Sequence, residues 1–197
     1  MEDKTSDVIQ RARRGDLDAF DDLVALHERR VWGLAHQITN NADEARDIAQ
    51  EVFLRVHRHL GRYDPGRPFE SWLYRITVNC AYDHIKKRPA FVPLDSLLAE
   101  HSPALADTQS GNPTAAMETR DLHAALRRSL GCLTPQERSV FILRDVRGLA
   151  TREIAYILGC TTITVRRHSS NARLKLREAL AGQVSARSAG GRNEGAK

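Results

Sequence analysis

The chain lacks the patterns that mark zinc proteins, secreted disulfide-rich proteins and membrane proteins. Its three cysteines, Cys80, Cys132 and Cys160, form no CxxC pair, and its eight histidines show no HExxH or similar spacing. This argues against a structural zinc site or a disulfide framework, and each cysteine is interpreted as a small buried side chain in a reducing cytosol. No apolar signal-peptide core and no run of membrane length is present. We therefore expect a cytoplasmic protein without membrane insertion.

The chain also lacks a constellation for catalysis. It has no paired carboxylates with histidine, no glycine-rich phosphate loop and no Cys/His site. The sequence therefore predicts neither an enzyme nor a metal or cofactor site.

Lysine and arginine are absent from Pro89 to Thr119, although the whole chain has a net charge of +5. Residues 89–118 contain four prolines and several acids, which predicts a flexible acidic linker. Residues 182–197 are small and polar, which predicts a disordered tail.

Apolar residues recur at helical spacing on both sides of the linker, and no strand pattern is present. Helices are expected from Asp7 to about Arg14, after the cap Asp16, from Ala42, and over residues 69–87. The prediction is an all-α fold of two small helical domains, residues 1–88 and 119–181.

The second domain has the spacing of a helix-turn-helix. Thr134 to Glu137 is a capping box that begins a helix to about Val146. A short amphipathic helix follows, Gly159 permits a tight turn, and the last helix carries five bases and no acid from Thr162 to Arg177. This pattern predicts binding in the major groove of duplex DNA. A solvated basic face on a helical hairpin is the alternative.

The helix over residues 69–87 combines aromatic, amide and basic side chains. Phe69, Trp72 and Tyr74 are followed by Asn79 and by a basic end. If these side chains are exposed, they suit single-stranded DNA, because rings stack on bases and cations bind phosphates. Aromatic residues packed in the core are the alternative.

Three segments in this order resemble the extracytoplasmic-function (ECF) sigma factors of bacterial RNA polymerase. They are DEARDIAQEVFLRVHRHL (43–60), PFESWLYRITVNCAYDHIKKR (68–88) and LTPQERSVFILRDVRGLATREIAYILGCTTITV (133–165). The resemblance covers nearly all of residues 16–180. It implies a dissociable specificity subunit, with sigma region 2 before the linker and sigma region 4 after it. The partners implied are core RNA polymerase through its clamp helices and flap, promoter DNA, and an anti-sigma factor.

The resemblance also implies three sets of site residues. Docking on the polymerase clamp would use Asp47, Gln50, Glu51 and Arg55, for which a solvated acidic helix face is the alternative. The melted −10 element would contact Arg67, Phe69, Trp72, Arg75, Asn79, Asp83, Lys86 and Lys87, with a flipped base held at the 61–68 loop. The duplex −35 element would contact Thr162, Thr164, Arg166, Arg167, Ser170 and Arg173. The linker would pass through the active-site and RNA-exit channels, and a plain spacer is the alternative.

The last helix departs from the family pattern at several positions. Ile163 replaces the turn glycine, Arg167 stands at the usual serine, and Ser169 falls where an apolar residue normally packs inward. Alanine replaces a helix-capping serine at position 150, so Thr151 is expected to cap in part. We expect the same groove-binding geometry with a different −35 preference, in which Arg166 and Arg167 make guanine or phosphate contacts.

One other class stays open, a free-standing helix-turn-helix regulator that binds operators as a dimer. Residues 1–88 would then be a sensing or oligomerisation domain. Such a regulator should protect DNA alone, whereas the sigma hypothesis predicts weak DNA binding until core polymerase is added.

Overall fold

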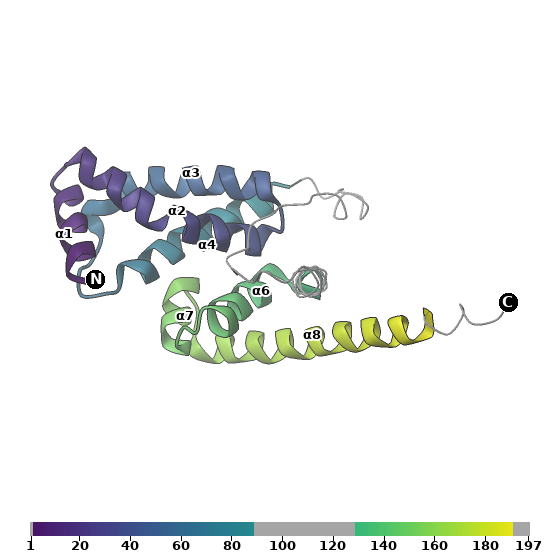
Figure 1. Ribbon diagram of the computed structural model, residues 1–197. Coiled ribbons are helices and arrows are strands. Elements are labelled where there is room, and N and C mark those ends of the chain that lie inside the picture. Colours follow the sequence, from purple (N-terminus) through teal and green to yellow (C-terminus); the bar gives the residue numbers. More distant parts are fainter. Residues whose placement is uncertain (1, 89–128, 191–197) are drawn as a thin grey trace, which may run out of the picture.

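The computed structural model describes residues 2–88 and 129–190, and both ranges are helical with no strand in either. The first range holds α1 (Glu2–Arg13), α2 (Leu17–Thr39), α3 (Ala42–His59), the 3₁₀ helix η1 (Leu60–Arg62) and α4 (Phe69–Lys87). The second holds α6 (Pro135–Phe141), the π-helix η3 (Ile142–Val146), α7 (Thr151–Leu158) and α8 (Thr162–Gly190). In Figure 1, α6 and α7 lie between the α1–α4 bundle and the long α8. The all-α prediction is confirmed, and the predicted linker lies outside the described residues.

Polar caps fix the helix boundaries of the first domain. The Asp16 carboxylate accepts a hydrogen bond from the Ala19 backbone N–H at 3.0 Å and begins α2. Asn40 ends α2 in the left-handed conformation, with φ of 56°. The Asn41 side chain then accepts from the Glu44 N–H at 3.0 Å and begins α3. The Asp16 and Asn41 side chains each satisfy a donor that the helix itself leaves free, and each such N-cap stabilises the fold by about 1 kcal/mol.

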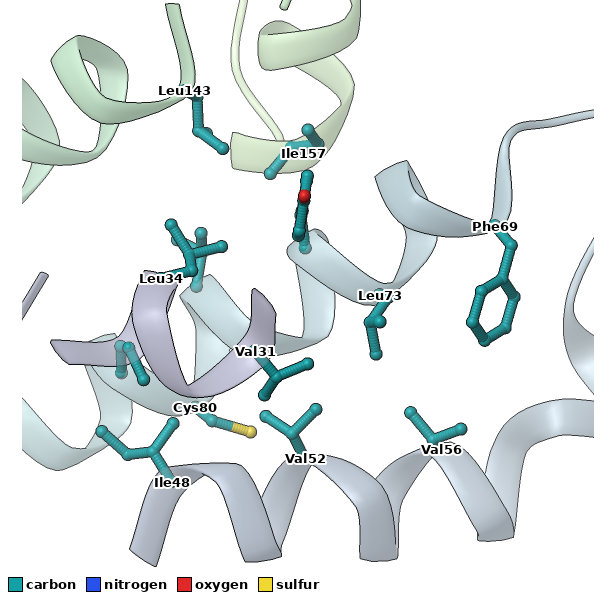
Figure 2. Packing of buried hydrophobic residues seen from close by; sticks show 14 of the residues in the cluster. Val31, Leu34, Ile48, Val52, Val56, Phe69, Leu73, Cys80, Leu143 and Ile157 are labelled. Carbon is teal, nitrogen blue, oxygen red and sulfur yellow. The ribbon is translucent and has the colours of Figure 1, made fainter. Parts of the chain in front are cut away.

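The core of the first domain forms where α2, α3 and α4 meet (Figure 2). Its fully buried side chains include Val31 and Leu34 from α2, Ile48, Val52 and Val56 from α3, and Leu73 and Cys80 from α4. Burial raises the pKa of the Cys80 thiol to about 11, so this cysteine is an unreactive core residue.

The other two cysteines are less buried than predicted. Cys160 is half-buried and Cys132 is exposed. Cys132 lies in the turn before α6, where its thiol donates to the Ser129 carbonyl at 2.8 Å. A turn on the surface leaves this side chain in solvent, so the prediction of three buried cysteines is wrong at Cys132.

Capping and a single π turn shape the second domain. Thr134 and Glu137 form the predicted capping box at the start of α6. The helix is α-helical only to Phe141 and then widens, with the Arg147 N–H bonded to the Ile142 carbonyl at 3.0 Å. The added residue per turn presents both Ile142 and Leu143 to the interior, where both are buried.

The two domains share one apolar core. Leu143 and Ile157 of the second domain are fully buried in the same cluster as Leu34 of α2, and Tyr74 of α4 is also buried there (Figure 2). The Arg147 guanidinium donates to the Tyr74 hydroxyl at 2.9 Å and lies 4.9 Å from the centre of its ring. We call this contact between α4 and the second domain the domain interface.

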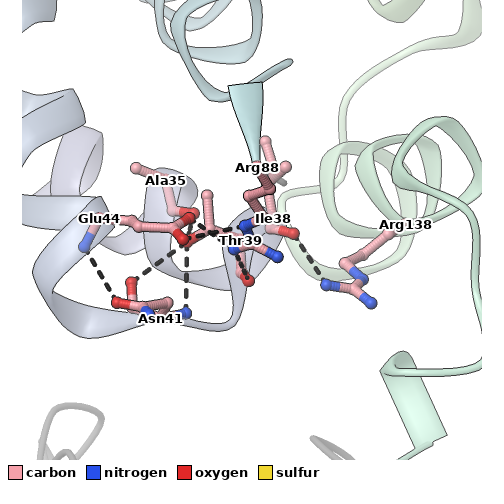
Figure 3. Close-up of polar contacts among 7 residues, drawn as sticks. All are labelled: Ala35, Ile38, Thr39, Asn41, Glu44, Arg88 and Arg138. Carbon is pink, nitrogen blue, oxygen red and sulfur yellow. Dashed lines mark hydrogen bonds and ion pairs between the residues drawn. The ribbon is translucent and has the colours of Figure 1, made fainter. Parts of the chain in front are cut away.

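Two arginines close the C-terminal end of α2, and one of them, Arg138, links α2 to the second domain (Figure 3). Arg88, just after α4, donates to the Thr39 carbonyl at 3.0 Å and to the Glu44 carboxylate. Arg138 of α6 donates to the Ile38 carbonyl at 2.8 Å. Helix C-termini carry unpaired carbonyls and a partial negative charge, so cations here satisfy both.

Several predicted boundaries need correction. Helix α1 begins at Glu2 instead of Asp7, and α8 continues past residue 181 to Gly190, where a disordered tail was expected. Alanines in that stretch favour a helix, and no proline interrupts it. The expected cap from Thr151 is wrong, because Ala150 is the N-cap of α7 and no side chain caps that end.

Candidate nucleic-acid interface

One side of α4 carries a stripe of polar and cationic side chains. Arg75, Asn79 and Lys86 are exposed at helical spacing, and Lys87 is exposed beside them at the end of the helix. The stripe therefore offers an amide and three cations to solvent on one element. This combination suits a nucleic-acid strand, with the amide for a base edge and the cations for phosphates.

The aromatic residues of α4 are less accessible than predicted. Phe69 and Tyr74 are 7% and 5% exposed, respectively, so both belong to the core. Trp72 is half-buried, with its ring centre 5.5 Å from that of Tyr63 and 5.7 Å from that of Phe69. Core packing, the alternative to an exposed aromatic face, holds for Phe69 and Tyr74, because α4 is covered on two sides. Phe69 is therefore not on the surface, as its predicted −10 contact would require. Both rings support the site from within.

The same aromatic cluster supports the 61–68 loop. The Tyr63 hydroxyl donates to the Arg67 carbonyl at 2.6 Å, and the Asp64 carboxylate accepts from the Gly66 N–H at 2.9 Å. Arg67 itself is exposed. The loop is therefore held against the start of α4 while its cationic side chain stays on the surface.

Arg67 and Arg75 converge on one aromatic ring of the second domain. Their guanidinium carbons lie 4.3 Å and 5.0 Å, respectively, from the ring centre of Tyr156 on α7. Both distances are within the range of cation–π attraction. Nearby, the Ser71 hydroxyl hydrogen-bonds to the Glu153 carboxylate. In this arrangement α7 lies against two predicted −10 contacts, Arg67 in the 61–68 loop and Arg75 on α4.

An ion-pair chain joins α3 to α4. The Arg55 guanidinium donates to the Glu51 carboxylate at 2.7 Å and to the Asp83 carboxylate at 3.3 Å. The hydrogen bond from Arg55 holds the pKa of Glu51 below its usual value. Asp83, predicted to contact the −10 element, is thus brought together with two residues predicted to contact polymerase. A carboxylate repels phosphates, so this geometry favours a structural pairing for Asp83.

The other two predicted polymerase contacts on α3, Asp47 and Gln50, are exposed. Sequence reasoning missed Leu54, which is 53% exposed on this helix. The signal was available, because position 54 falls outside the apolar stripe of α3 and on the side of the acidic face. Leu54 adds exposed apolar area to this otherwise polar and charged helix face.

Helix α8 divides into an inward and an outward side. Val165, Ser169 and Ala172 face the interior and are buried, whereas Arg166, Arg167 and Ser170 are exposed. Two threonines at the start, Thr162 and Thr164, are half-buried. Thr161 caps the helix by accepting from the Thr164 N–H at 3.1 Å. Three of the predicted −35 contacts therefore share one solvent-exposed surface.

Other polar residues of α8 have partners within the protein. The Ser169 hydroxyl accepts from the Arg144 guanidinium at 3.3 Å, which explains a polar residue at an inward position. Arg173, a predicted −35 contact, forms an ion pair with Asp145. Lys175 pairs with Glu137 at 2.8 Å, and the Glu137 side chain is almost fully buried. Lys175 therefore ties α8 to α6.

The protein has a helix-turn-helix with a basic outer face and, on α4, a second helix with polar and cationic side chains. These features are those of a DNA-binding transcription factor. Residues 23–90 match the Sigma-70 region 2 family, and residues 123–176 match the Sigma-70 region 4 family. The chain is 32% identical to the RNA polymerase sigma-H factor of Pseudomonas aeruginosa, over 91% of this chain and 95% of that protein. It is 31% identical to the ECF RNA polymerase sigma factor SigW of Bacillus subtilis, over 87% of this chain and 94% of that protein.

The chain belongs to the extracytoplasmic-function sigma factors of RNA polymerase. The fold agrees, because the structure of CnrH in complex with the cytosolic domain of CnrY aligns with a TM-score of 0.63 at 25% identity. That alignment covers 89% of this chain and 96% of the other. No helix in the described ranges has the length and apolar character needed to cross a bilayer.

Proposed function

We propose that this protein is the promoter-specificity subunit of a cytoplasmic RNA polymerase and has no catalytic activity of its own. The observation that carries the proposal is the presence of two DNA-compatible surfaces on one chain. The stripe on α4 has cations and an amide suited to a single strand, and the outer face of α8 suits a duplex groove. Two such surfaces match the two promoter elements that initiation requires.

At the −10 element, Asn79 would contact a base edge while Arg75, Lys86 and Lys87 hold phosphates. All four side chains are exposed on one region of α4, which supports this assignment. Arg67 would bind next to the 61–68 loop, where a flipped base can be held without an intact stack. Trp72, half-buried at the start of α4, would border that base.

At the −35 element, Arg166, Arg167 and Ser170 would enter the major groove. An exposed arginine can bind guanine through O6 and N7 or bind a phosphate. Because Arg173 is paired with Asp145, its contribution would require that ion pair to exchange for a phosphate. The acidic segment 89–118 would connect the two DNA-bound domains through the polymerase channels.

The exposed face of α3 would bind the clamp helices of core polymerase, with Asp47 and Gln50 at its edge and Leu54 within it. The second domain would contact the polymerase flap. CnrH was solved with the cytosolic domain of CnrY, and NepR is named an anti-sigma factor in the complex with RpoE of Bartonella quintana. We propose a comparable anti-sigma partner for this protein.

The domain interface has to open for the −10 contacts to form. Tyr156 lies against Arg67 and Arg75, so a DNA strand and the tyrosine ring would compete for the same two cations. The free protein would therefore hold its −10 surface partly covered until polymerase or DNA separates the domains.

Transcription in vitro tests the proposal. A library of randomised promoters is transcribed by core polymerase with and without the protein, and we expect initiation from a subset of promoters only when it is present. Arg166→Ala should change the selected −35 sequence or lower the salt dependence of binding by about one phosphate contact. Protection of DNA by the protein alone, with no added initiation, would favour the dimeric regulator instead.

A further inference from the structure

Ile163 is the most exposed of the large apolar side chains in the described part of the protein. It is the second residue of α8, and 74% of its surface is in contact with solvent. Two positions later, Val165 is fully buried. The side chain of Ile163 therefore points away from the domain that its own helix helps to build.

The fold does not require isoleucine at this position. A β-branched residue has lower helix propensity than alanine, and burial does not compensate here. Single exposed apolar residues are common on proteins, so exposure alone carries little weight. The location distinguishes Ile163, because Arg166, Arg167 and Ser170 follow it at spacings of three, four and seven residues. Those spacings place all four on one side of the helix.

That side of α8 is the one that would enter the major groove, where the first residues of a recognition helix contact base edges. The edges of adenine, guanine and cytosine present hydrogen-bond donors and acceptors there but no methyl group, whereas thymine also presents its C5-methyl group. An isoleucine over a polar edge would remove water from it without replacing the hydrogen bonds. Over a thymine it would bury two apolar groups against each other.

We propose that Ile163 is a specificity-determining residue that contacts the C5-methyl group of a thymine in the −35 element. The inference rests on the proposed function of α8. It predicts a thymine, on either strand, beside the base pairs contacted by Arg166 and Arg167.

Deoxyuridine substitution tests the contact, because uracil differs from thymine only by that methyl group. Each thymine of the −35 element, in a promoter selected by the wild-type holoenzyme, is replaced singly on either strand. At one thymine we expect open-complex formation to need about fourfold more holoenzyme, as for the loss of one buried methyl. For the Ile163→Ala holoenzyme the same replacement should have no effect. Leu174→Ala, at a residue 51% exposed on the same helix, should keep the wild-type sensitivity.

Insensitivity of the wild-type holoenzyme to every replacement would overturn the proposal, and so would a selected −35 element without thymine. An unchanged sensitivity of the Ile163→Ala holoenzyme would overturn it as well. Failure of the proposed function looks different, because then no promoter of the library is transcribed at all. Circular dichroism checks that the Ile163→Ala variant is folded. If it is not, the deoxyuridine replacements with the wild-type holoenzyme still test the proposal.

Discussion

Replacing Tyr156 by leucine should uncover the −10 surface of the free protein. The substitution removes the aromatic ring that lies 4.3 Å from the Arg67 guanidinium and 5.0 Å from that of Arg75. A cation–π contact at an exposed site is worth about 0.5–1 kcal/mol. Losing both would lower the stability of the closed arrangement by about 1–2 kcal/mol and raise the open fraction about 5- to 30-fold. Affinity for a −10 single strand should rise by the same factor while the open form is rare.

Fluorescence anisotropy with a labelled −10 non-template oligonucleotide measures that affinity. Energy transfer between dyes on α1 and α8 reports the domain separation independently. Tyr156→Phe is the matched control, because it keeps the ring and should bind DNA like the wild type. If the leucine variant bound DNA with wild-type affinity and unchanged energy transfer, the reasoning would be refuted. Equal gains in both variants would show that the ring face does not hold the arginines.

Three further predictions follow from single residues. Burial, with a smaller effect of a nearby arginine, lowers the pKa of His27 from 6.5 to about 4, so the unfolded chain takes up its proton first. About 3 kcal/mol of unfolding free energy, present above pH 6.5, should be lost as the pH falls toward 4. Urea unfolding at several pH values measures this loss. His27→Leu should make it smaller, and the control His59→Gln should leave it unchanged. Leu54→Ala should weaken core polymerase binding about tenfold or more in a pull-down titration, whereas Leu26→Ala, equally exposed on α2, should not. Asp83→Asn should lower the free energy of unfolding by at most about 1 kcal/mol and leave promoter affinity undiminished in a filter-binding assay; a clear loss of affinity would restore its role as a DNA contact.

Local chemistry made part of the fold predictable. Asp16 and the Thr134 capping box define helix starts through their own side chains, and both were visible in the sequence. The π turn at Ile142 was not, because the same residues could continue an α-helix and only packing selects the wider turn. Whether the aromatic residues of α4 lie on the surface or in the core stayed open, because apolar spacing shows only one buried side of a helix. Helix α4 has two buried sides, one against its own domain and one against α7.

The candidate site was predictable where it depends on one helix and not where it depends on two. Arg166 and Arg167 were assigned from the family resemblance and the basic character of α8, and their exposure on the outer side of that helix is compatible with the assignment. The pairing of Asp83 with Arg55, and of Arg75 with Tyr156, arises from contacts between distant segments. No local pattern encodes such distances, so both residues were assigned to DNA without their protein partners.

The shared apolar core has a kinetic consequence for assembly. Leu143 and Ile157 are buried in a cluster that includes residues of both domains, so separating the domains is a first-order step with its own rate. If core polymerase accepts only the separated form, its binding rate will stop rising once polymerase is abundant and will level off at that opening rate. The timing of a transcriptional response would then be limited by an event inside the sigma factor, however much polymerase is free.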